Sequence, residues 1–164
     1  MKVINIHKRT IQQPKEEVST LFTTLATEKD LIWPIENWPA MKFRDGVKVG
    51  SRGGHGPIRY TIIELVHGEH IKFKFSKPEG FHGIHQLMVK AISDSKTEIT
   101  HEIKMNTSLK ASLLWIFVIR WLHDALIEDA FDKVENYFEV DAPKHSEHNI
   151  WVKLLRAVKK RKSI

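Results

Sequence analysis

The amino-acid sequence predicts an α+β domain in which an antiparallel sheet is followed by one long helix. Residues 108–138 contain neither Pro nor Gly, the two residues that break helices most reliably. Before them, between residues 58 and 105, strand-like runs are joined in pairs by short turns, which is typical of antiparallel hairpins. A length of 164 residues suits one domain with a sizeable core.

The long helix changes character along its length. Residues 113–119 are apolar without interruption, so this half is hydrophobic on every side and we expect it to be buried. The cover would be the loop around Trp33 and Trp38 or the C-terminal tail, ahead of a dimer interface. The run is far shorter than the roughly 18 apolar residues that a membrane span requires. The second half has one apolar face, made of Ile119, Leu122, Leu126, Ile127, Ala130, Val134 and Tyr137.

One polar residue interrupts this apolar face. His123 falls near its centre, where the pattern predicts a side chain that points toward the sheet. Two interpretations are open. His123 is either a buried histidine bonded to a neighbour, or a polar group aimed into a cavity.

Composition and charge limit the location and the partners of the protein. The chain has no cysteine, and residues 1–13 lack the apolar run of a signal peptide, so we expect a cytoplasmic protein without disulfides. The excess positive charge lies after residue 143, where Lys144, Lys153, Arg156, Lys159, Lys160, Arg161 and Lys162 accompany a single acid, Glu147. The remaining body is neutral. The net positive charge of the chain therefore does not indicate a nucleic-acid-binding face on the domain, and we expect no nucleic-acid partner.

The first third of the chain predicts a strand, a short helix and a stiff loop. Residues 2–9 alternate as a strand does, and residues 14–27 begin a helix at Pro14. In the next segment Trp33 and Trp38 each precede a proline, which restricts the backbone to extended conformations. The two tryptophans either cap the core or belong to a lid or rim over a pocket.

Residues 44–57 are rich in glycine and predict turns. They contain neither the phosphate-binding pattern G-x-x-x-x-G-K-[ST] nor G-x-G-x-x-G, so we expect no nucleotide and no other cofactor. His55 lies among glycines that permit close backbone approach. It is either an incidental turn residue or a functional one.

Four strands are predicted at residues 58–66, 70–76, 82–92 and 97–105. Pairing Leu65 with Ile71 would place Arg59 and Ile63 on the inner face, beside the Phe73 and Phe75 face of the next strand. Pairing Ala91 with Thr97 would place Leu87 opposite His101. The inner face would then hold His85 and His101 as diagonal neighbours, about 7–8 Å apart at Cα.

The C-terminal segment, residues 141–164, predicts a linker and a basic amphipathic helix. Residues 141–148 have the composition of a linker, and Ile150, Trp151, Leu154, Leu155 and Val158 then recur at helical spacing among basic residues. This helix either packs on the domain with a solvated basic end, or docks on an anionic membrane or an acidic partner. Peripheral membrane contact would involve residues 147–162.

Three motifs carry a family resemblance: GGHGPIRY (53–60), PEGFHGIH (78–85) and RWLHDALIEDA (120–130). With the order of the elements, they resemble a cyclase-like subgroup of the START/SRPBCC superfamily, which includes polyketide cyclases and lipid-transfer domains. The resemblance covers residues 1–140. It implies a helix-grip fold, in which a curved antiparallel sheet wraps around one long C-terminal helix and encloses a cavity.

The leading hypothesis is binding or transport of a hydrophobic small molecule or lipid in that cavity. Arg59 would pair with a polar group of the ligand and the histidines would hydrogen-bond it. The expected ligand-binding residues are Trp33, Trp38, Arg59, Ile63, Phe73, Phe75, His85, Leu87, His101, Ile103, Ile119, His123 and Ile127. The oligomeric state stays open.

The alternative is an enzyme of the cyclase or dehydratase type. His85, His101 or His123 would act in general acid–base catalysis, with Arg59 stabilising an enolate-like oxygen. A metal site built from the three histidines has no H-E-x-x-H motif to support it, and we expect no metal. The third alternative is a docking role, in which the apolar helix start or the basic tail binds a membrane or another protein.

Overall fold

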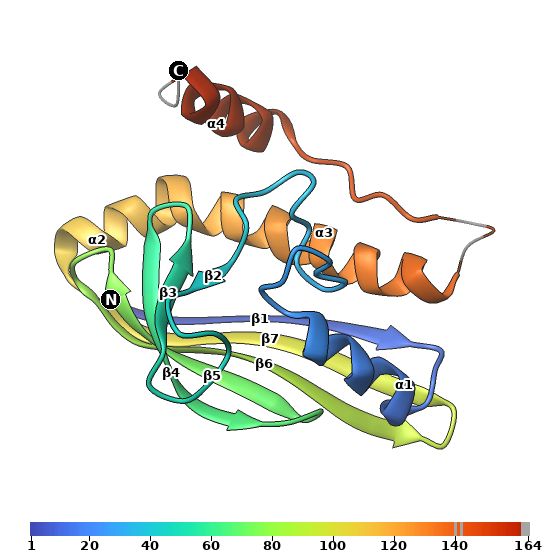
Figure 1. The fold of residues 1–164 in the computed structure, drawn as a ribbon. Helices are drawn as coiled ribbons and strands as arrows, with labels where there is room; N and C mark the ends of the chain where they lie inside the picture. The colour runs from blue at the N-terminus through green and yellow to red at the C-terminus, as the bar shows by residue number, and fades with distance from the viewer. Residues whose placement is uncertain (140, 142, 162–164) are drawn as a thin grey trace.

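The computed structural model describes residues 1–139, 141 and 143–161, with side chains as far as residue 158. In chain order the elements are β1 (Lys2–Ile11), α1 (Lys15–Thr20), the 3-10 turn η1 (Leu21–Thr24), β2 (Lys42–Phe43), β3 (Arg52–His55), β4 (Ile58–Val66), β5 (His70–Lys77), β6 (Phe81–Ser93), β7 (Lys96–Thr107), α2 (Leu109–Leu114), the π-helical turn η2 (Trp115–Ile119), α3 (Arg120–Phe138) and α4 (Ile150–Arg161). The fold class is α+β, as predicted: a curved sheet packs against one long helix (Figure 1).

The sheet is antiparallel throughout. Its strands lie in the order β1-β7-β6-β5-β4-β3-β2, so the first strand pairs with the last and leaves the short β2 at the far edge. The predicted pairings are confirmed: Leu65 opposes Ile71, Ala91 opposes Thr97, and Leu87 opposes His101. Because the β6–β7 register is the predicted one, His85 and His101 are diagonal neighbours, as expected.

The inner face of β4 differs from the predicted one. Between the pairs Ile62–Phe73 and Glu64–Lys72 the register shifts, and Ile63 has no partner on β5. An extra residue in one strand inverts the alternation of side chains beyond it. Ile62 is consequently buried, whereas Ile63 is exposed, as is Arg59 nearer the start of the strand. The predicted inward orientation of Arg59 and Ile63 is therefore wrong.

The long helix runs without interruption through α2, η2 and α3, from Leu109 to Phe138. Ser108 caps its start by accepting a hydrogen bond from the Ala111 amide. On α3 the buried apolar residues are Leu126, Ile127, Ala130, Phe131 and Val134. The predicted inward position of Tyr137 is wrong, because Phe138 takes the core position in the last turn and Tyr137 is half exposed.

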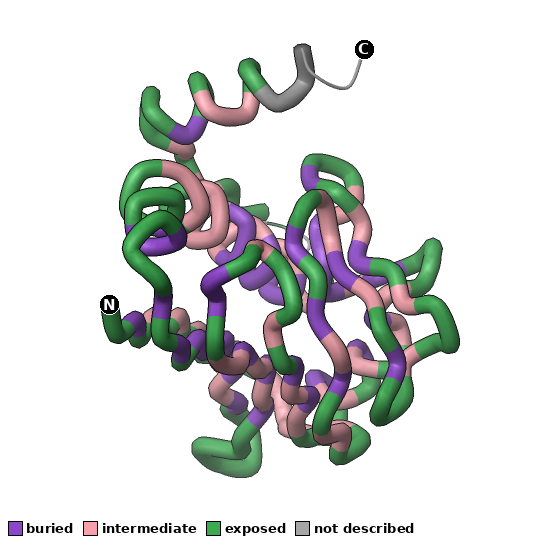
Figure 2. Tube along the Cα trace, turned by 90° about the vertical axis from the view of Figure 1, so that its left-hand side faces the viewer, coloured by how far each residue is buried: buried purple, intermediate pink, exposed green. Residues whose placement is uncertain are grey.

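The apolar start of the long helix is not buried as predicted. Ala111 and Trp115 pack against the sheet in a cluster with Phe81, but Leu113 and Phe117 are exposed. Figure 2, viewed toward this end of the helix, shows both exposed and buried stretches in its turns. The physical reason is that only one side of α2 and η2 meets the sheet, and the opposite side has little cover. No helix in the described part of the chain is long and apolar enough to span a membrane.

Two short strands, β2 and β3, were not predicted: β3 lies within residues 44–57, where the sequence predicts turns, and β2 lies just before them. They extend the sheet at the edge next to β4. Gly54 makes this possible, because its φ is +155° and a Cβ there would overlap the Ile58 carbonyl oxygen. The close approach of β3 to β4 fixes the position of His55 at the end of β3.

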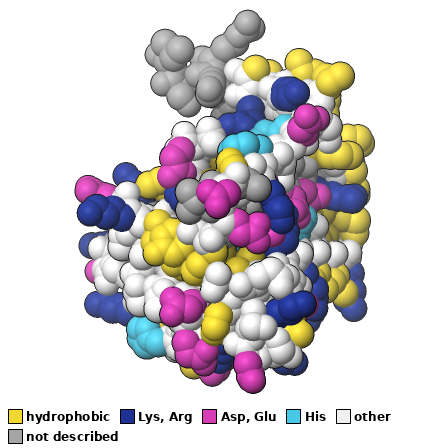
Figure 3. Space-filling model, turned by 90° about the vertical axis from the view of Figure 1, so that its right-hand side faces the viewer, with side chains coloured by type: hydrophobic (Ala, Val, Ile, Leu, Met, Phe, Trp, Pro, Cys, Tyr) yellow, Lys and Arg dark blue, Asp and Glu magenta, His cyan; other side chains and the backbone are white. Residues whose placement is uncertain are grey.

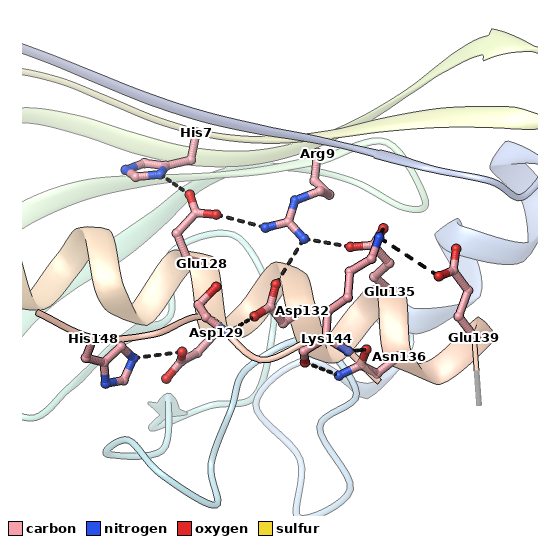
Figure 4. Close-up of polar contacts among 11 residues, drawn as sticks. His7, Arg9, Glu128, Asp129, Asp132, Glu135, Asn136, Glu139, Lys144 and His148 are labelled. Atoms are coloured by element: carbon pink, nitrogen blue, oxygen red, sulfur yellow. Dashed lines mark hydrogen bonds and ion pairs between the residues drawn. The ribbon is translucent and has the colours of Figure 1, made fainter. Parts of the chain in front are cut away.

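The segment after α3 is held along that helix rather than free (Figure 4). Lys144 forms an ion pair with Glu135, and the Ser146 amide donates to Asp132 at 2.6 Å. His148 Nε2 lies 2.9 Å from Asp129 Oδ1. Residues 144–148 of the predicted linker thus lie against α3, and the predicted tail helix is α4. Residues 140 and 142 of the linker region and residue 162 of the tail lie outside the described residues.

Candidate functional site

A cavity of about 340 Å³ lies between the sheet and the long helix. The long helix contributes Trp115, Ile119, Leu122, His123, Leu126 and Ile127, and the sheet contributes Ile58, Phe75, Phe81, His85, His101 and Ile103. The remaining wall is formed by the Trp33–Trp38 loop, the turn that carries His55 and Pro57, and Arg156 of α4. A mainly apolar wall with a few polar groups is typical of a small-molecule site.

The structure brings nine of the thirteen predicted ligand-binding residues to this wall. They are Trp33, Trp38, Phe75, His85, His101, Ile103, Ile119, His123 and Ile127. Phe73 and Leu87 line a smaller adjoining void of about 20 Å³ instead. Arg59 and Ile63 are on neither wall; the Arg59 guanidinium donates to the backbone carbonyls of Gly56 and Ile58. Arg59 therefore does not face this cavity.

Three histidines form a row across the cavity wall. The ring centroids of His85 on β6 and His101 on β7 lie 5.6 Å apart, and those of His101 and His123 on α3 lie 4.9 Å apart. Neighbouring strands and the facing helix thus each supply one imidazole. The pairing of β6 with β7 brings His85 and His101 together as predicted, and the ring distance to His101 places His123 beside them.

Each of these imidazoles has one ring nitrogen with no hydrogen-bond partner among the described residues. The atoms are His85 Nε2, His101 Nδ1 and His123 Nε2, and all three are buried. Burial lowers the pKa of each histidine, well below the ordinary value for His85 and His101. The three rings are therefore neutral at pH 7, and each still has a polar atom to pair.

His85 is fixed by the aromatic rings around it. Its ring stacks on Phe73 and Phe75 at centroid distances of 4.6 and 4.7 Å, and Tyr60 meets it edge-on at 4.6 Å. Phe73 is its cross-strand partner on β5, so the register of the sheet sets this stack. An imidazole held in this way has little rotational freedom.

The Trp33–Trp38 loop closes one side of the cavity. Asp30 organises the loop by accepting hydrogen bonds from the Ile32 and Trp33 amides at 2.9 and 2.7 Å. The Trp38 indole donates to Asp129 on α3 at 2.6 Å, which ties the loop to the long helix. Both tryptophans are buried and both line the cavity. The loop therefore covers the core and also forms part of the cavity wall.

His55 also reaches the cavity wall. Its Nδ1 lies 3.0 Å from the Tyr60 hydroxyl oxygen, and its ring centroid lies 4.7 Å from that of Trp33. The sequence left its role open between an incidental and a functional residue. The surrounding glycines were the only signal, because they allow the backbone to approach β4 closely.

Behind His123, away from the cavity, lies a cluster of charged residues. His123 Nδ1 is 3.4 Å from Asp124 Oδ1, and the same oxygen is 3.1 Å from His7 Nε2. His7 Nδ1 is 2.7 Å from Glu128 Oε1. Burial opposes protonation of His7, but its hydrogen bonds to Asp124 and Glu128 outweigh it and raise its pKa to about 9. His7 is therefore an imidazolium cation at pH 7.

Arg9 continues this charged cluster along α3 (Figure 4). Its guanidinium donates to Glu128 at 2.9 Å, to Asp132 at 3.0 Å and to Glu135 at 2.6 Å. Asp132 and Glu135 are almost fully buried, so Arg9 balances carboxylates that water does not reach. The cluster joins β1 to α3 beside the cavity.

His7, His123 and Asp124 are the residues closest to a metal-binding arrangement in the described part of the chain. One ligand atom from each lies within 4.8 Å of the others. Both nitrogens of His7 face carboxylates, however, and the resulting imidazolium has no lone pair for a metal. These three residues therefore suit the binding of a proton better than the binding of a metal ion.

Sequence reasoning missed other parts of the wall. Trp115, Leu122 and Leu126 belong to the long helix, and Trp115 was concealed in a segment that is apolar on every side. Arg156 comes from the tail helix, whose position no sequence pattern fixes. His7 and Arg9 alternate on β1 and could have been read as inward-facing charges, but their partners lie 117 or more residues away.

Comparisons with known proteins support the fold. No family model matches the chain, and no curated protein is similar to it in sequence. A solution structure from Thermobifida fusca matches with a TM-score of 0.64 at 14% identity, over 88% of this chain and 99% of that one. Norcoclaurine synthase from Thalictrum flavum, in complex with dopamine and hydroxybenzaldehyde, matches with a TM-score of 0.64 at 11% identity, over 88% of this chain and 90% of that one.

A third similar structure covers nearly the whole chain. CalU16 from Micromonospora echinospora matches with a TM-score of 0.57 at 13% identity, over 99% of this chain and 94% of that one. These identities are too low to carry an activity across. They show the helix-grip arrangement of an antiparallel sheet and a long C-terminal helix.

Proposed function

We propose that the cavity binds a small, mainly apolar molecule that has at least one polar group. The apolar wall would take up the body of the ligand, and the histidine row would hydrogen-bond the polar group. With this function we propose membership of the cyclase-like START/SRPBCC subgroup, for which the three sequence motifs and the fold give support. Residues 1–140 would form the ligand-binding domain.

The observation that carries the proposal is the set of unpaired nitrogens on His85, His101 and His123. A buried polar atom without a partner costs about 1–3 kcal/mol. Three such atoms on one cavity wall are a cost to folding that a purely structural core would avoid with apolar residues. A ligand with a hydroxyl or carbonyl group recovers part of that cost on binding.

The similar structures are compatible with a ligand of this kind. Norcoclaurine synthase was solved with dopamine and hydroxybenzaldehyde, two small aromatic molecules that each carry polar groups. A cavity of about 340 Å³ has a size suited to molecules of this class. Trp33, Trp38 and Trp115 on its wall provide a fluorescence signal for binding.

The proposal is tested with two matched probes, naphthol and naphthalene, titrated against tryptophan fluorescence. We expect both to bind and naphthol to bind about tenfold more tightly, because its hydroxyl group pairs with a histidine nitrogen. In His101→Leu the advantage of naphthol over naphthalene should shrink. Ile63→Leu, on the exposed side of β4, is the control and should bind both probes as the unaltered protein does.

Binding of neither probe would contradict the proposal. Equal affinity for naphthol and naphthalene would remove the role assigned to the histidines. Because Leu is close to His in size, circular dichroism melting of His101→Leu distinguishes a lost hydrogen bond from a lost fold.

A second candidate function, general acid–base catalysis, is favoured by the contact of His123 with Asp124. Asp124 Oδ1 lies 3.4 Å from His123 Nδ1, Nε2 has no partner among the described residues, and His123 lines the cavity. In this arrangement Nε2 would take a proton from a bound ligand and Asp124 would stabilise the imidazolium that forms. The enolate-stabilising role predicted for Arg59 is not retained, since Arg59 lies outside the cavity wall.

This second function is tested by proton exchange in a bound ketone. Tetralone incubated with the protein in D2O should gain deuterium next to its carbonyl, faster than with His123→Gln. Asp124→Asn should slow the exchange and shift its pH profile, because the partner of Nδ1 loses its charge. Tetralone that binds without exchange would leave the protein as a binding module alone.

A further inference from the structure

We propose that the exposed apolar surface formed by α2, η2 and α4 docks on a membrane that carries anionic lipids. On the long helix this docking surface contains Leu109, Leu113, Ile116 and Phe117. On α4 it contains Ile150, Trp151, Leu154 and Val158. Docking does not depend on whether the cavity binds a ligand.

The two apolar strips adjoin. The Trp151 indole on α4 donates a hydrogen bond to the Phe117 carbonyl on η2 at 3.0 Å. Val152 is the one buried side chain of α4 among residues 150–158 and holds the helix to the body, so Ile150, Leu154 and Val158 are left on the outer side. Figure 3 shows hydrophobic side chains gathered at the top of the molecule and along the adjoining edge. Contiguous exposed apolar surface of this kind marks an interaction site.

The positive charge of the docking surface favours an anionic partner. No acidic residue occurs between Glu102 and Asp124, or after Glu147. Lys110 and Arg120 flank the apolar residues of the long helix, and both are exposed. The tail adds Lys153 and the run at 159–162. Basic residues beside apolar ones are typical of helices that lie at the surface of an anionic bilayer.

A second copy of the chain fits this surface less well. A symmetric dimer would bring the same patch of each protomer together, and with it the exposed Lys110 and Lys153 of both copies. Trp121 and Trp151 are also half exposed on this surface, and indoles favour the interface between lipid and water. The docking surface is amphipathic, and the exposed charged residues named on it are basic. Both features favour a lipid surface over a second protein.

Docking would also place the cavity near the bilayer, a consequence that rests on the proposed function. Arg156 of α4 lies over the Trp38 ring at 4.5 Å and donates to the Asn37 carbonyl at 2.9 Å. Arg156 and Trp38 both line the cavity. An apolar ligand could then pass between the cavity and the bilayer without crossing water.

Vesicle flotation of the whole chain tests the docking. We expect binding to phosphatidylcholine vesicles that contain about a third phosphatidylglycerol, weak binding to phosphatidylcholine alone, and weaker binding at high salt. Phe117→Glu and Leu154→Glu should each weaken binding about tenfold or more. Lys153→Gln should weaken it about fivefold.

Ile92→Glu is the matched control. Ile92 is 55% exposed, close to Phe117 at 58% and Leu154 at 53%, but it lies at the far end of β6. It should float as the unaltered protein does, and circular dichroism should show that all variants fold. No binding to anionic vesicles, or equal loss in Ile92→Glu, would overturn the proposal. A dimer that Phe117→Glu dissociates, in a protein that does not bind vesicles, would assign the surface to a second copy instead.

Discussion

His7 and His123 both lie near the same carboxylate oxygen, Asp124 Oδ1, and yet differ in charge. Their side chains are similarly exposed, at 14% and 11%, and their ring centroids are 5.7 Å apart. Two close carboxylates raise the pKa of His7 to about 9. His123 has one, at a longer distance, and burial lowers its pKa. The number and distance of acidic partners thus decide the state of each imidazole.

This difference separates a structural region from a candidate ligand site. In the charged cluster of His7 and Arg9, the charges are paired, as expected of a part of the core that must be stable. In the cavity, His85, His101 and His123 each retain an unpaired nitrogen. Substitutions in the first region should therefore change stability, and substitutions in the second should change binding.

The largest effect is expected for Arg9→Ala. The change leaves the carboxylates of Glu128, Asp132 and Glu135 without their shared cation, two of them buried. We expect the free energy of unfolding to fall by about 3 kcal/mol or more, measured by urea denaturation. Lys8→Ala, which removes an exposed ion pair from the same strand, should cost about 1 kcal/mol or less. Equal losses in the two variants would contradict the distinction.

A smaller, pH-dependent effect is expected for His7→Gln. The folded-state pKa of His7, about 9, exceeds the ordinary value of 6.5, so protonated His7 stabilises the fold fully below 6.5. That stability is lost as the pH rises through 9. The unaltered protein should exceed His7→Gln by about 2 kcal/mol near pH 6, allowing for the partial exposure of Glu128, and the two should converge above about pH 10. A constant difference across this range would refute the assignment.

The smallest effect on stability, with the opposite sign, is expected for His101→Leu. Its folded-state pKa lies below the ordinary value, so the unfolded chain binds the proton more tightly and stability falls as the pH drops below 6.5. Removing the imidazole should reduce this acid sensitivity. Near pH 7.5 the variant should be slightly the more stable, because the removal of an unpaired nitrogen is partly offset by lost ring contacts with His85 and His123. Near pH 5 its advantage should reach about 1.5 kcal/mol. Greater acid sensitivity in the variant would contradict a neutral, buried His101.

Local patterns in the sequence predicted the β4–β5 and β6–β7 hairpins because the strands of each hairpin are neighbours in the chain. The turn at residues 67–69 and the turn before Lys96 set the register of the hairpins, so His85 and His101 were placed correctly. Alternation failed in β4 because an unpaired Ile63 inverts the faces, which a hydrophobic pattern does not reveal.

The parts that depend on distant contacts could not be predicted. The charged cluster needs β1 to lie beside α3, and the position of Arg156 needs α4 to pack near Trp38. Exposure of the helix start also depends on what covers it, and an all-apolar pattern predicts burial whether or not a partner segment is present. Each of these errors marks a place where the packing of separate elements, rather than periodicity, decides the structure.

The most direct test of the account follows the imidazole nitrogens themselves. Long-range ¹H–¹⁵N spectra of the histidine rings can be recorded without ligand, with naphthalene and with naphthol. We expect neutral rings for His85, His101 and His123 at pH 7, and a shift of His101 Nδ1 or His123 Nε2 with naphthol that naphthalene does not produce. Charged rings at these positions, or naphthol shifts confined to the exposed His67 and His82, would contradict the central claim.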